Sequence, residues 1–329
     1  MLNEYGGPDV LSLEDRPCPA PAAGEVLVKV DTVGVGKPDV LFRTGSYPWA
    51  PPLPLVIGNE MAGTIVAVGE GVRGLSVGQP VHALKTDGGC CAEFVAVPSG
   101  IVTPLPDGGS MERSVGALNF LLAHCLLHEA GKVTPGQSLY INGAAGGVGI
   151  AIIQMAKRAG MRVIAGCSTD EKCAFAIAHG ADGAVNYRSD GVEQAVQDFT
   201  DDRGVDLILD QYVGAGFLRN FEMLAPLGQV IIYNWVGGMP PADTAAAMTA
   251  FISKCPAIRW FSLHYLDAQA DRRTAILGQM IELITSGMVG NPIFARLPLA
   301  QAAEAHRLLD AGAVLGKLLL KPQHAGVPA

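Results

Sequence analysis

The chain has 329 residues and a formal net charge of −8 at pH 7, with 49% hydrophobic and 16% charged residues. This length allows two domains of ordinary size, and the composition is typical of a compact α/β protein rather than a disordered one. The acidic balance argues against a nucleic-acid partner. There is no apolar run of the roughly 20 residues that a membrane span needs, no signal-peptide pattern and no C-x-x-C pair among the seven cysteines. We therefore expect a reduced, cytoplasmic protein with no membrane partner.

The first hundred residues predict short strands separated by glycine and proline. Residues 3–14 predict a turn and then an alternating strand, and residues 39–43 a short helix that Gly45 ends. Up to about residue 105 the pattern indicates a partly open barrel. The further strands expected here are 25–31, 63–69 and 93–97.

The pattern changes near residue 115. Ser110-Met-Glu-Arg113 is a capping-type sequence that opens a helical region, and strands then alternate with helices as in a parallel, doubly wound sheet. We expect one domain formed by 1–115 and 263–329, whose tail returns to the barrel, and a second domain at 116–262. The strands expected in the second domain are 138–142, 162–166, 205–209 and 229–233, with helices near 147–160, 170–180, 190–200 and 215–226. In the tail, helices are expected at 268–286 and 299–311 and a strand at 317–321.

One stretch, 138–158, predicts a buried strand, a glycine turn and the start of a helix. Its segment Ala144-Ala-Gly-Gly-Val-Gly149 matches the dinucleotide fingerprint G-x-G-x-x-G except for an alanine at the first position. The backbone N–H groups at such a helix start bind a pyrophosphate. We expect that contact at Ala145, Gly146, Gly147 and Val148. The alternative is a glycine turn that only packs helix on strand.

The second strand of this domain suggests which dinucleotide binds. An NAD-binding unit carries a carboxylate at the tip of that strand, but here Ser168 follows it, and Lys172 lies one helical turn further. A ribose 2′-phosphate needs hydroxyl donors and a cation, so these residues predict NADPH. Tyr187 can add a phenol donor or stack on adenine. The alternatives are a helix N-cap for Ser168, a surface lysine for Lys172 and a packing residue for Tyr187.

Motifs spread over nearly the whole chain carry a family resemblance. They include Tyr5-Gly-Gly-Pro-Asp-Val-Leu, Pro54-Leu-Val-Ile-Gly-Asn-Glu-Met-Ala-Gly63, Ala144-Ala-Gly-Gly-Val-Gly149 and Gly180-Ala-Asp-Gly-Ala-Val-Asn-Tyr187. With these motifs the chain resembles the medium-chain dehydrogenase/reductase superfamily, in its zinc-free, zeta-crystallin-like quinone oxidoreductase branch. The resemblance implies a GroES-like, partly open β-barrel domain beside a Rossmann domain. The family's first strand, ahead of Glu4, is largely missing, so we expect a sequence that starts late or lacks an edge strand.

The resemblance also implies that no metal is bound. Zinc-dependent relatives carry a cysteine near Gly36 and a histidine at Asn59, so two ligands are replaced. Cys90 and Cys91 are expected to be small packing residues.

Without a metal, hydride transfer needs a ready acceptor, so the implied substrate is a quinone or the C=C of an α,β-unsaturated carbonyl. Tyr47 stands where enoyl-reductase relatives have a proton donor; the alternative is a packed loop aromatic. Asn234 and Lys317 match positions near the cofactor in relatives; the alternative for Lys317 is a plain lysine of the terminal strand. A homodimer joined near Arg259–Leu263 is also implied.

Two other functions stay open. One is an enoyl-thioester reductase, for which the sequence shows no basic cluster that would take a phosphopantetheine. The other is a non-catalytic NADPH-binding protein, because Gly36 and Leu122-Ala123-His124 depart from the residues that relatives place beside the nicotinamide. His124 itself is expected to be a core histidine.

Overall fold

The computed structural model of the chain describes residues 1–189 and 191–323. The described residues form two compact units. Unit 1 consists of Met1–Leu118 and the segment that begins at Leu266, and unit 2 of Asn119–Tyr265.

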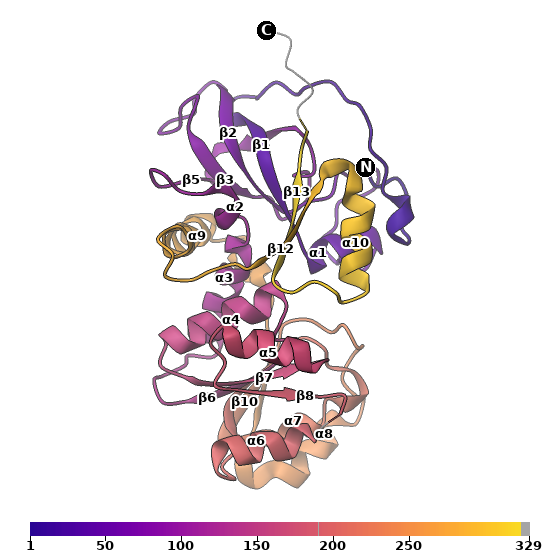
Figure 1. Ribbon diagram of the computed structural model, residues 1–329, viewed down its shortest axis with the longest axis vertical. Helices are drawn as coiled ribbons and strands as arrows, with labels where there is room; N and C mark the ends of the chain where they lie inside the picture. Colours follow the sequence, from indigo (N-terminus) through magenta and orange to yellow (C-terminus); the bar gives the residue numbers. More distant parts are fainter. Residues whose placement is uncertain (190, 324–329) are drawn as a thin grey trace. The chain divides into compact units, whose positions relative to one another are not determined.

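Unit 1 is built on a seven-stranded sheet with the order β12-β13-β1-β2-β3-β5, whose strands Figure 1 labels. The seventh strand, β4, pairs with β1. β1 is the strand that holds this sheet together, because it pairs with β4 near its start, with β13 at its end and with β2 along most of its length. Register shifts after Leu27 and after Val30 bend it, which suits a barrel. The strands are β1 (Glu25–Val35), β2 (Glu60–Val68), β3 (Pro80–Leu84), β4 (Phe94–Pro98), β5 (Val102–Pro104), β12 (Ile293–Pro298) and β13 (Lys317–Lys321).

Alternating valines of β1 form the centre of the unit 1 core. Val26, Val28 and Val30 are fully buried, and they pack with Leu318 and Leu320 of β13. The tail of the chain therefore contributes to the same core as its first strand.

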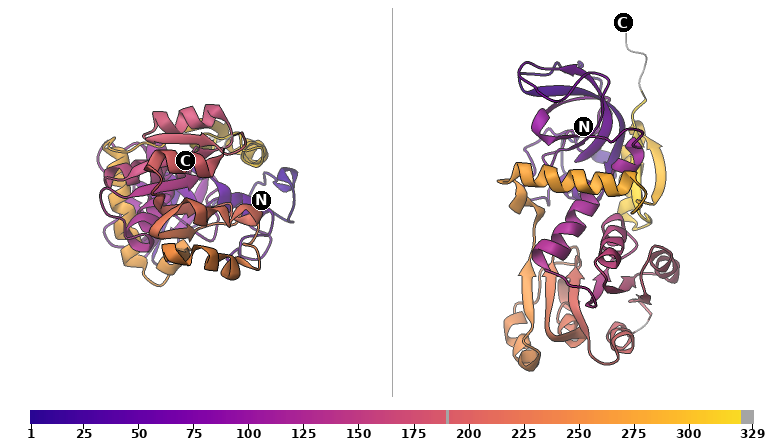
Figure 2. Two further views of the ribbon diagram at one scale, coloured as in Figure 1. Left: turned by 90° about the horizontal axis from the view of Figure 1, so that it is seen from below. Right: turned by 90° about the vertical axis from the view of Figure 1, so that its left-hand side faces the viewer.

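The helices of unit 1 lie around this barrel. The longest of them, α9, contacts β5 and is the orange helix that crosses the right-hand view of Figure 2. The alternating strand expected within residues 3–14 is wrong. Pro8 fixes its own φ and starts a turn of 3₁₀ helix instead, after which Leu11 makes only an isolated bridge to Leu2. The helices are α1 (Lys37–Arg43), α2 (Met111–Ser114), α9 (Ala270–Thr285) and α10 (Ala302–Asp310), with 3₁₀ turns η1 (Pro8–Val10), η2 (Ser99–Ile101) and η7 (Leu299–Gln301).

Unit 2 is built on six parallel strands in the order β11-β10-β9-β6-β7-β8. Figure 1 labels β6, β7, β8 and β10 of this sheet. From β6 the chain goes to β7 and β8 on one side and then to β9, β10 and β11 on the other, so the strand order reverses between β6 and β9. The strands are β6 (Ser138–Asn142), β7 (Arg162–Cys167), β8 (Gly183–Asn186), β9 (Val205–Asp210), β10 (Leu224–Ile232) and β11 (Ala257–Trp260).

The connections between these strands are mostly helical. The remaining elements are α3 (Ala117–His124), the π-helix η3 (Cys125–Ala130), α4 (Gly147–Arg158), α5 (Asp170–Ala178), α6 (Val192–Thr200), η4 (Gly214–Gly216), α7 (Arg219–Met223), α8 (Thr244–Ala247), η5 (Met248–Lys254) and η6 (Leu263–Leu266).

The helix expected at 215–226 is wrong in its extent. The structure has only η4 and the five-residue α7 there, and Leu224 already pairs with Val205 of β9. Pro226 explains the early end, because a proline disfavours helical geometry in the residue before it. Leu224 and Ala225 are fully buried as part of β10.

Candidate functional site

The glycine turn of unit 2 lies at the carboxyl end of β6, where the strand order reverses. Gly146 is the N-cap of α4, and no side chain caps this helix. The Ile150 N–H donates to the Gly146 carbonyl, so the N–H groups of the first helical residues have no partner within the helix. Gly146, Gly147 and Val148 are partly accessible, whereas Ala145 is 4% exposed. Of the four predicted residues, Ala145 is therefore the least accessible to a ligand.

The last glycine of the motif, Gly149, is required by the close packing of α4 against the turn after β6. A Cβ on Gly149 would lie 2.4 Å from the carbonyl oxygen of Ala144. Helix α4 can start this close to β6 only because Gly149 carries no side chain.

The predicted 2′-phosphate residues lie together at the tip of β7. The Lys172 Nζ donates a hydrogen bond to the Ser168 Oγ (3.0 Å). Thr169, not Ser168, is the N-cap of α5, and its hydroxyl accepts from the Lys172 N–H (3.3 Å). The N-cap alternative for Ser168 is therefore wrong. Tyr187 is 37% exposed, and its N–H donates to the Cys167 carbonyl (3.0 Å), which fixes it beside the same strand end.

Asn234 follows β10 at the same carboxyl edge of the sheet. Its side-chain oxygen accepts from the backbone N–H of Trp235 (2.8 Å). This local turn fixes the start of the loop after β10.

Tyr47 lies in unit 1 after α1, with its ring centroid 4.7 Å from that of Phe42 and 5.6 Å from that of Trp49. It is partly buried against a cluster formed by Leu2, Phe42, Leu55 and Ile57. Burial, with Asp267 and Asp39 adding to it, raises the pKa of the Tyr47 phenol to about 12. The phenol therefore keeps its proton across the neutral range and can serve as a donor. The packing and the proton-donor interpretations both fit this position.

Lys317, predicted beside the cofactor, belongs to a buried polar cluster of unit 1. Its Nζ lies 3.1 Å from the Glu60 Oε2, and the Glu60 Oε1 lies 3.1 Å from the His82 Nε2 and accepts from the Leu118 N–H (2.9 Å). Although burial acts in the opposite direction, Lys317 and the hydrogen bond with His82 hold the pKa of Glu60 at about 2. Glu60 therefore stays ionised and fixes the lysine ammonium.

Asp39 is a second buried carboxylate of this region. It accepts hydrogen bonds from the N–H groups of Gly36 (2.8 Å) and Gly58 (3.1 Å) and from the amide of Asn59 (3.3 Å). Burial raises the pKa of Asp39 to about 6. The sequence indicates Asp39 only as the start of a short helix, and it does not identify Glu60 and His82 as a polar cluster, since the partners of Glu60 are distant in sequence.

The positions where zinc-dependent relatives carry ligands do not fit a catalytic zinc. Gly36 has no side chain, the Asn59 amide donates to Asp39, and the Glu60 carboxylate already binds the Lys317 ammonium. Over residues 1–189 and 191–323, no three His, Cys, Asp or Glu side chains are placed to hold a metal ion.

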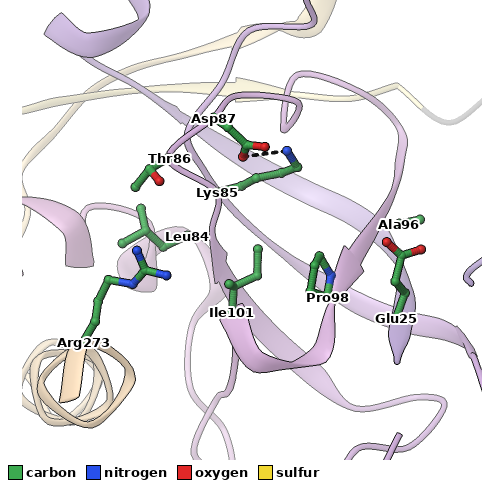
Figure 3. A pocket seen from close by; sticks show the side chains of 9 residues that line it. All are labelled: Glu25, Leu84, Lys85, Thr86, Asp87, Ala96, Pro98, Ile101 and Arg273. Carbon is green, nitrogen blue, oxygen red and sulfur yellow. Dashed lines mark hydrogen bonds and ion pairs between the residues drawn. The ribbon is translucent and has the colours of Figure 1, made fainter. Parts of the chain in front are cut away.

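A surface pocket of about 420 Å³ in unit 1 contains none of the predicted site residues (Figure 3). Lys85 and Asp87 form an ion pair (2.7 Å) in it, Arg273 projects into it from α9, and Leu84 and Ile101 supply apolar wall. Arg273 is also paired with Asp267 (3.1 Å). Both cations thus have carboxylate partners, and we assign this pocket no function.

Two family models match the chain. One, described as alcohol dehydrogenase GroES-like domain, covers residues 22–107, and one described as zinc-binding dehydrogenase covers residues 147–267. The predicted fold class, a GroES-like barrel with a Rossmann domain, is confirmed.

Among known proteins, the chain is 29% identical to the synaptic vesicle membrane protein VAT-1 homolog of Rattus norvegicus, over 98% of this chain and 83% of that protein. No helix in the described parts of the chain has the length and apolar character that a membrane span requires.

Two solved structures are similar over 98% of both chains. A mycobacterial protein complexed with NADPH has a TM-score of 0.89 and 32% identity. The quinone oxidoreductase of Escherichia coli, also complexed with NADPH, has a TM-score of 0.90 and 26% identity. The chain therefore belongs to the medium-chain dehydrogenase/reductase superfamily, as a quinone oxidoreductase-like member.

Proposed function

We propose that the chain is an NADPH-dependent, zinc-independent reductase that transfers hydride to a quinone or to the β-carbon of an α,β-unsaturated carbonyl. In this proposal unit 2 binds the cofactor and unit 1 provides the substrate side. The observation that carries the proposal is the arrangement of Ser168 and Lys172 at the tip of β7, where a hydroxyl and an ammonium group lie 3.0 Å apart. The NADPH complexes of two relatives support it.

Residues of unit 2 account for binding. The open N–H groups at the start of α4 suit the pyrophosphate, and Ser168 with Lys172 suits the 2′-phosphate. Tyr187 can cover the adenine. The bound cofactor supplies a hydride from its reduced nicotinamide.

Residues of unit 1 account for the proton. Reduction of a quinone by hydride needs one proton to complete the hydroquinone, and reduction of an enone needs one at the α-carbon. The Tyr47 phenol, which stays protonated up to high pH, is our proposed donor, with water as the alternative. In this proposal the buried ion pair with Glu60 holds the Lys317 side chain in place near the cofactor (Nζ to Oε2, 3.1 Å).

Two further points complete the proposal. We propose a cytoplasmic location, with which the seven free cysteines, all in the described residues, are compatible. We also propose a homodimer that forms through the exposed edge strand β11.

The test combines cofactor titration with an acceptor panel. In fluorescence titrations, NADPH should bind at least about tenfold more tightly than NADH. Lys172→Ala should reduce this ratio of the two Kd values. Glu171→Gln is the matched control, because it removes a charge from the exposed residue next to Lys172. It should leave the ratio of the Kd values for NADH and NADPH unchanged. Equal affinities of the wild type for both cofactors would contradict the assignment.

In the same preparation, NADPH consumption is measured with 9,10-phenanthrenequinone, with a crotonyl thioester and without acceptor. Turnover with the quinone, unchanged after dialysis against EDTA, is the expected result. Preference for the thioester would favour the enoyl-thioester reductase, and no turnover with any acceptor would favour the non-catalytic binding protein.

A further inference from the structure

The carboxylate of Asp210, at the carboxyl end of β9, is the centre of a buried hydrogen-bond network in unit 2. Asp210 as a residue is 3% exposed. Its Oδ1 accepts from the Asn142 Nδ2 (2.5 Å) and from the N–H groups of Tyr212 (2.8 Å) and Val213 (3.0 Å), and its Oδ2 accepts from the Asn220 Nδ2 (2.9 Å). One carboxylate thus joins β6, α7 and the turn that follows its own strand.

The turn held by Asp210 contains an unfavourable backbone conformation. Val213 has φ of +60° and ψ of −120°, which a β-branched residue rarely adopts. The hydrogen bond from its N–H to Asp210 helps to keep it there. Such a conformation persists only where its surroundings determine it, and it is concentrated at ligand-binding sites.

The same turn is joined to the loop after β10. The Gly237 N–H donates to the Tyr212 carbonyl (2.7 Å), and the Gly214 N–H donates to the Gly238 carbonyl (3.0 Å). A Cβ on Gly214 would lie 2.5 Å from the Gly237 carbonyl oxygen, so the two loops are in close contact. Asp210 therefore fixes the loop after β9 directly, and through this loop it also fixes the loop after β10.

Asp210 is also joined to the glycine turn. The Asn142 side chain that donates to it precedes Gly143 directly, and the Asn142 Oδ1 accepts from the Gln211 N–H (3.1 Å). In an open α/β sheet the ligand lies outside the carboxyl ends of the strands where their order reverses, here between β6 and β9. Ser168 and Lys172 lie on the β7 side of that point. The other half of the dinucleotide then falls over the loops after β9 and β10.

We propose that Asp210 is a positioning residue for the nicotinamide half of the cofactor, acting through the 211–214 turn that its Oδ1 holds. This inference rests on the proposed NADPH function. It predicts that losing Asp210 weakens binding of the whole cofactor but spares a ligand that occupies only the adenosine half.

The experiment uses two probes, NADPH and 2′,5′-ADP, with affinities measured by titration on the full chain. Asp210→Ala should raise the Kd for NADPH about tenfold or more and leave that for 2′,5′-ADP within about twofold. Asp210→Asn should bind NADPH nearly as the wild type does. Its amide oxygen in place of Oδ1 can accept the hydrogen bonds that hold the 211–214 turn, and the Asn220 amide can rotate to accept from the new NH2 in place of Oδ2. If Asp210→Ala does not fold, Asp210→Ser takes its place under the same criteria.

Asp206→Ala is the matched control. Asp206 lies at the other end of β9 and also joins it to β6, since its Oδ2 accepts from the Ser138 N–H (2.8 Å). Asp206→Ala should lower the free energy of unfolding, and the ratio of the Kd for NADPH to the Kd for 2′,5′-ADP should stay as in the wild type.

Three outcomes would overturn the inference alone: equal loss of both ligands in Asp210→Ala, no loss of either, or an Asp210→Asn variant as weak as the alanine variant. A wild type that binds neither probe would overturn the proposed function, and this inference with it.

Discussion

The phenol of Tyr47 has two properties that normally belong to different roles. Its ring packs on Phe42, as a structural aromatic would, and its raised pKa keeps the hydroxyl protonated, as a proton donor requires. Since phenylalanine keeps the ring and removes only the hydroxyl, one substitution separates the two roles.

Tyr47→Phe should lower the rate of enone reduction by about 100-fold while the Kd for NADPH stays unchanged, because protonation of the α-carbon would then depend on water. Quinone reduction should change much less, since solvent readily protonates an oxygen. Steady-state rates with both acceptors measure the difference. Because the pKa of the Tyr47 phenol is raised to about 12, the phenol should stay protonated between pH 6 and 10. Over this range, the rate of enone reduction should therefore have the same pH dependence in the wild type and in Tyr47→Phe.

Tyr5→Phe is the control for Tyr47→Phe. It removes the hydroxyl of a half-exposed tyrosine in the same unit and should leave both rates unchanged. An unchanged enone rate in Tyr47→Phe would leave that residue as a packing aromatic only.

The elements of unit 2 were predictable where local sequence decides them. The strand expected at 138–142 coincides with β6, and the helix expected near 147–160 corresponds to α4 (Gly147–Arg158), since an apolar run, glycines and a helical period follow one another. The helix expected at 215–226 failed because pairing with β9 draws Leu224 into β10.

Parts of the candidate site could not be predicted for a similar reason. Glu60 and Lys317 are 257 positions apart in sequence, and Asn142 and Asp210 are 68 apart. No periodicity or motif spans such distances. In contrast, Ser168 and Lys172 are four residues apart, and their contact could be predicted.

The start of α4 gives a prediction at the scale of one element. Gly149→Ala places a methyl group 2.4 Å from the Ala144 carbonyl oxygen, a backbone atom that cannot move alone. Alanine favours a helix by roughly 1 kcal/mol, but overpacking costs about 1–3 kcal/mol. The thermal midpoint should therefore fall, and binding of NADPH should weaken as the helix start shifts.

Gly278→Ala is the matched control, because Gly278 lies inside α9 with nothing within 4 Å of its Cβ position. Its thermal midpoint should stay level or rise. A Gly149→Ala variant as stable as this control would show that the close approach of α4 to Ala144 is not required.

At the scale of the whole molecule, the sheet of unit 2 ends in a strand that is poorly covered. β11 is last in the strand order, and its Trp260 is 49% exposed and lies edge-on to Trp235, with ring centroids 5.8 Å apart. An edge strand with exposed aromatic residues is a template for pairing with another chain. A second copy that pairs through β11 in a two-fold arrangement would cover this edge.

Trp260→Glu should therefore convert a dimer into a monomer. In the contact, the new carboxylate would lose its hydration and would lie close to the same carboxylate of the second chain. Size-exclusion chromatography with light scattering gives the mass directly. Ile177→Glu is the control, because it places the same charge on a similarly exposed apolar residue. Ile177 lies in α5, next to β7 and β8 at the other end of the sheet, so this variant should leave the mass unchanged.

A wild type with the mass of one chain, 34.2 kDa, would contradict the dimer, and a Trp260→Glu variant that stays dimeric would place the contact elsewhere. Unchanged NADPH affinity in the monomeric variant would further show that each chain binds its cofactor independently.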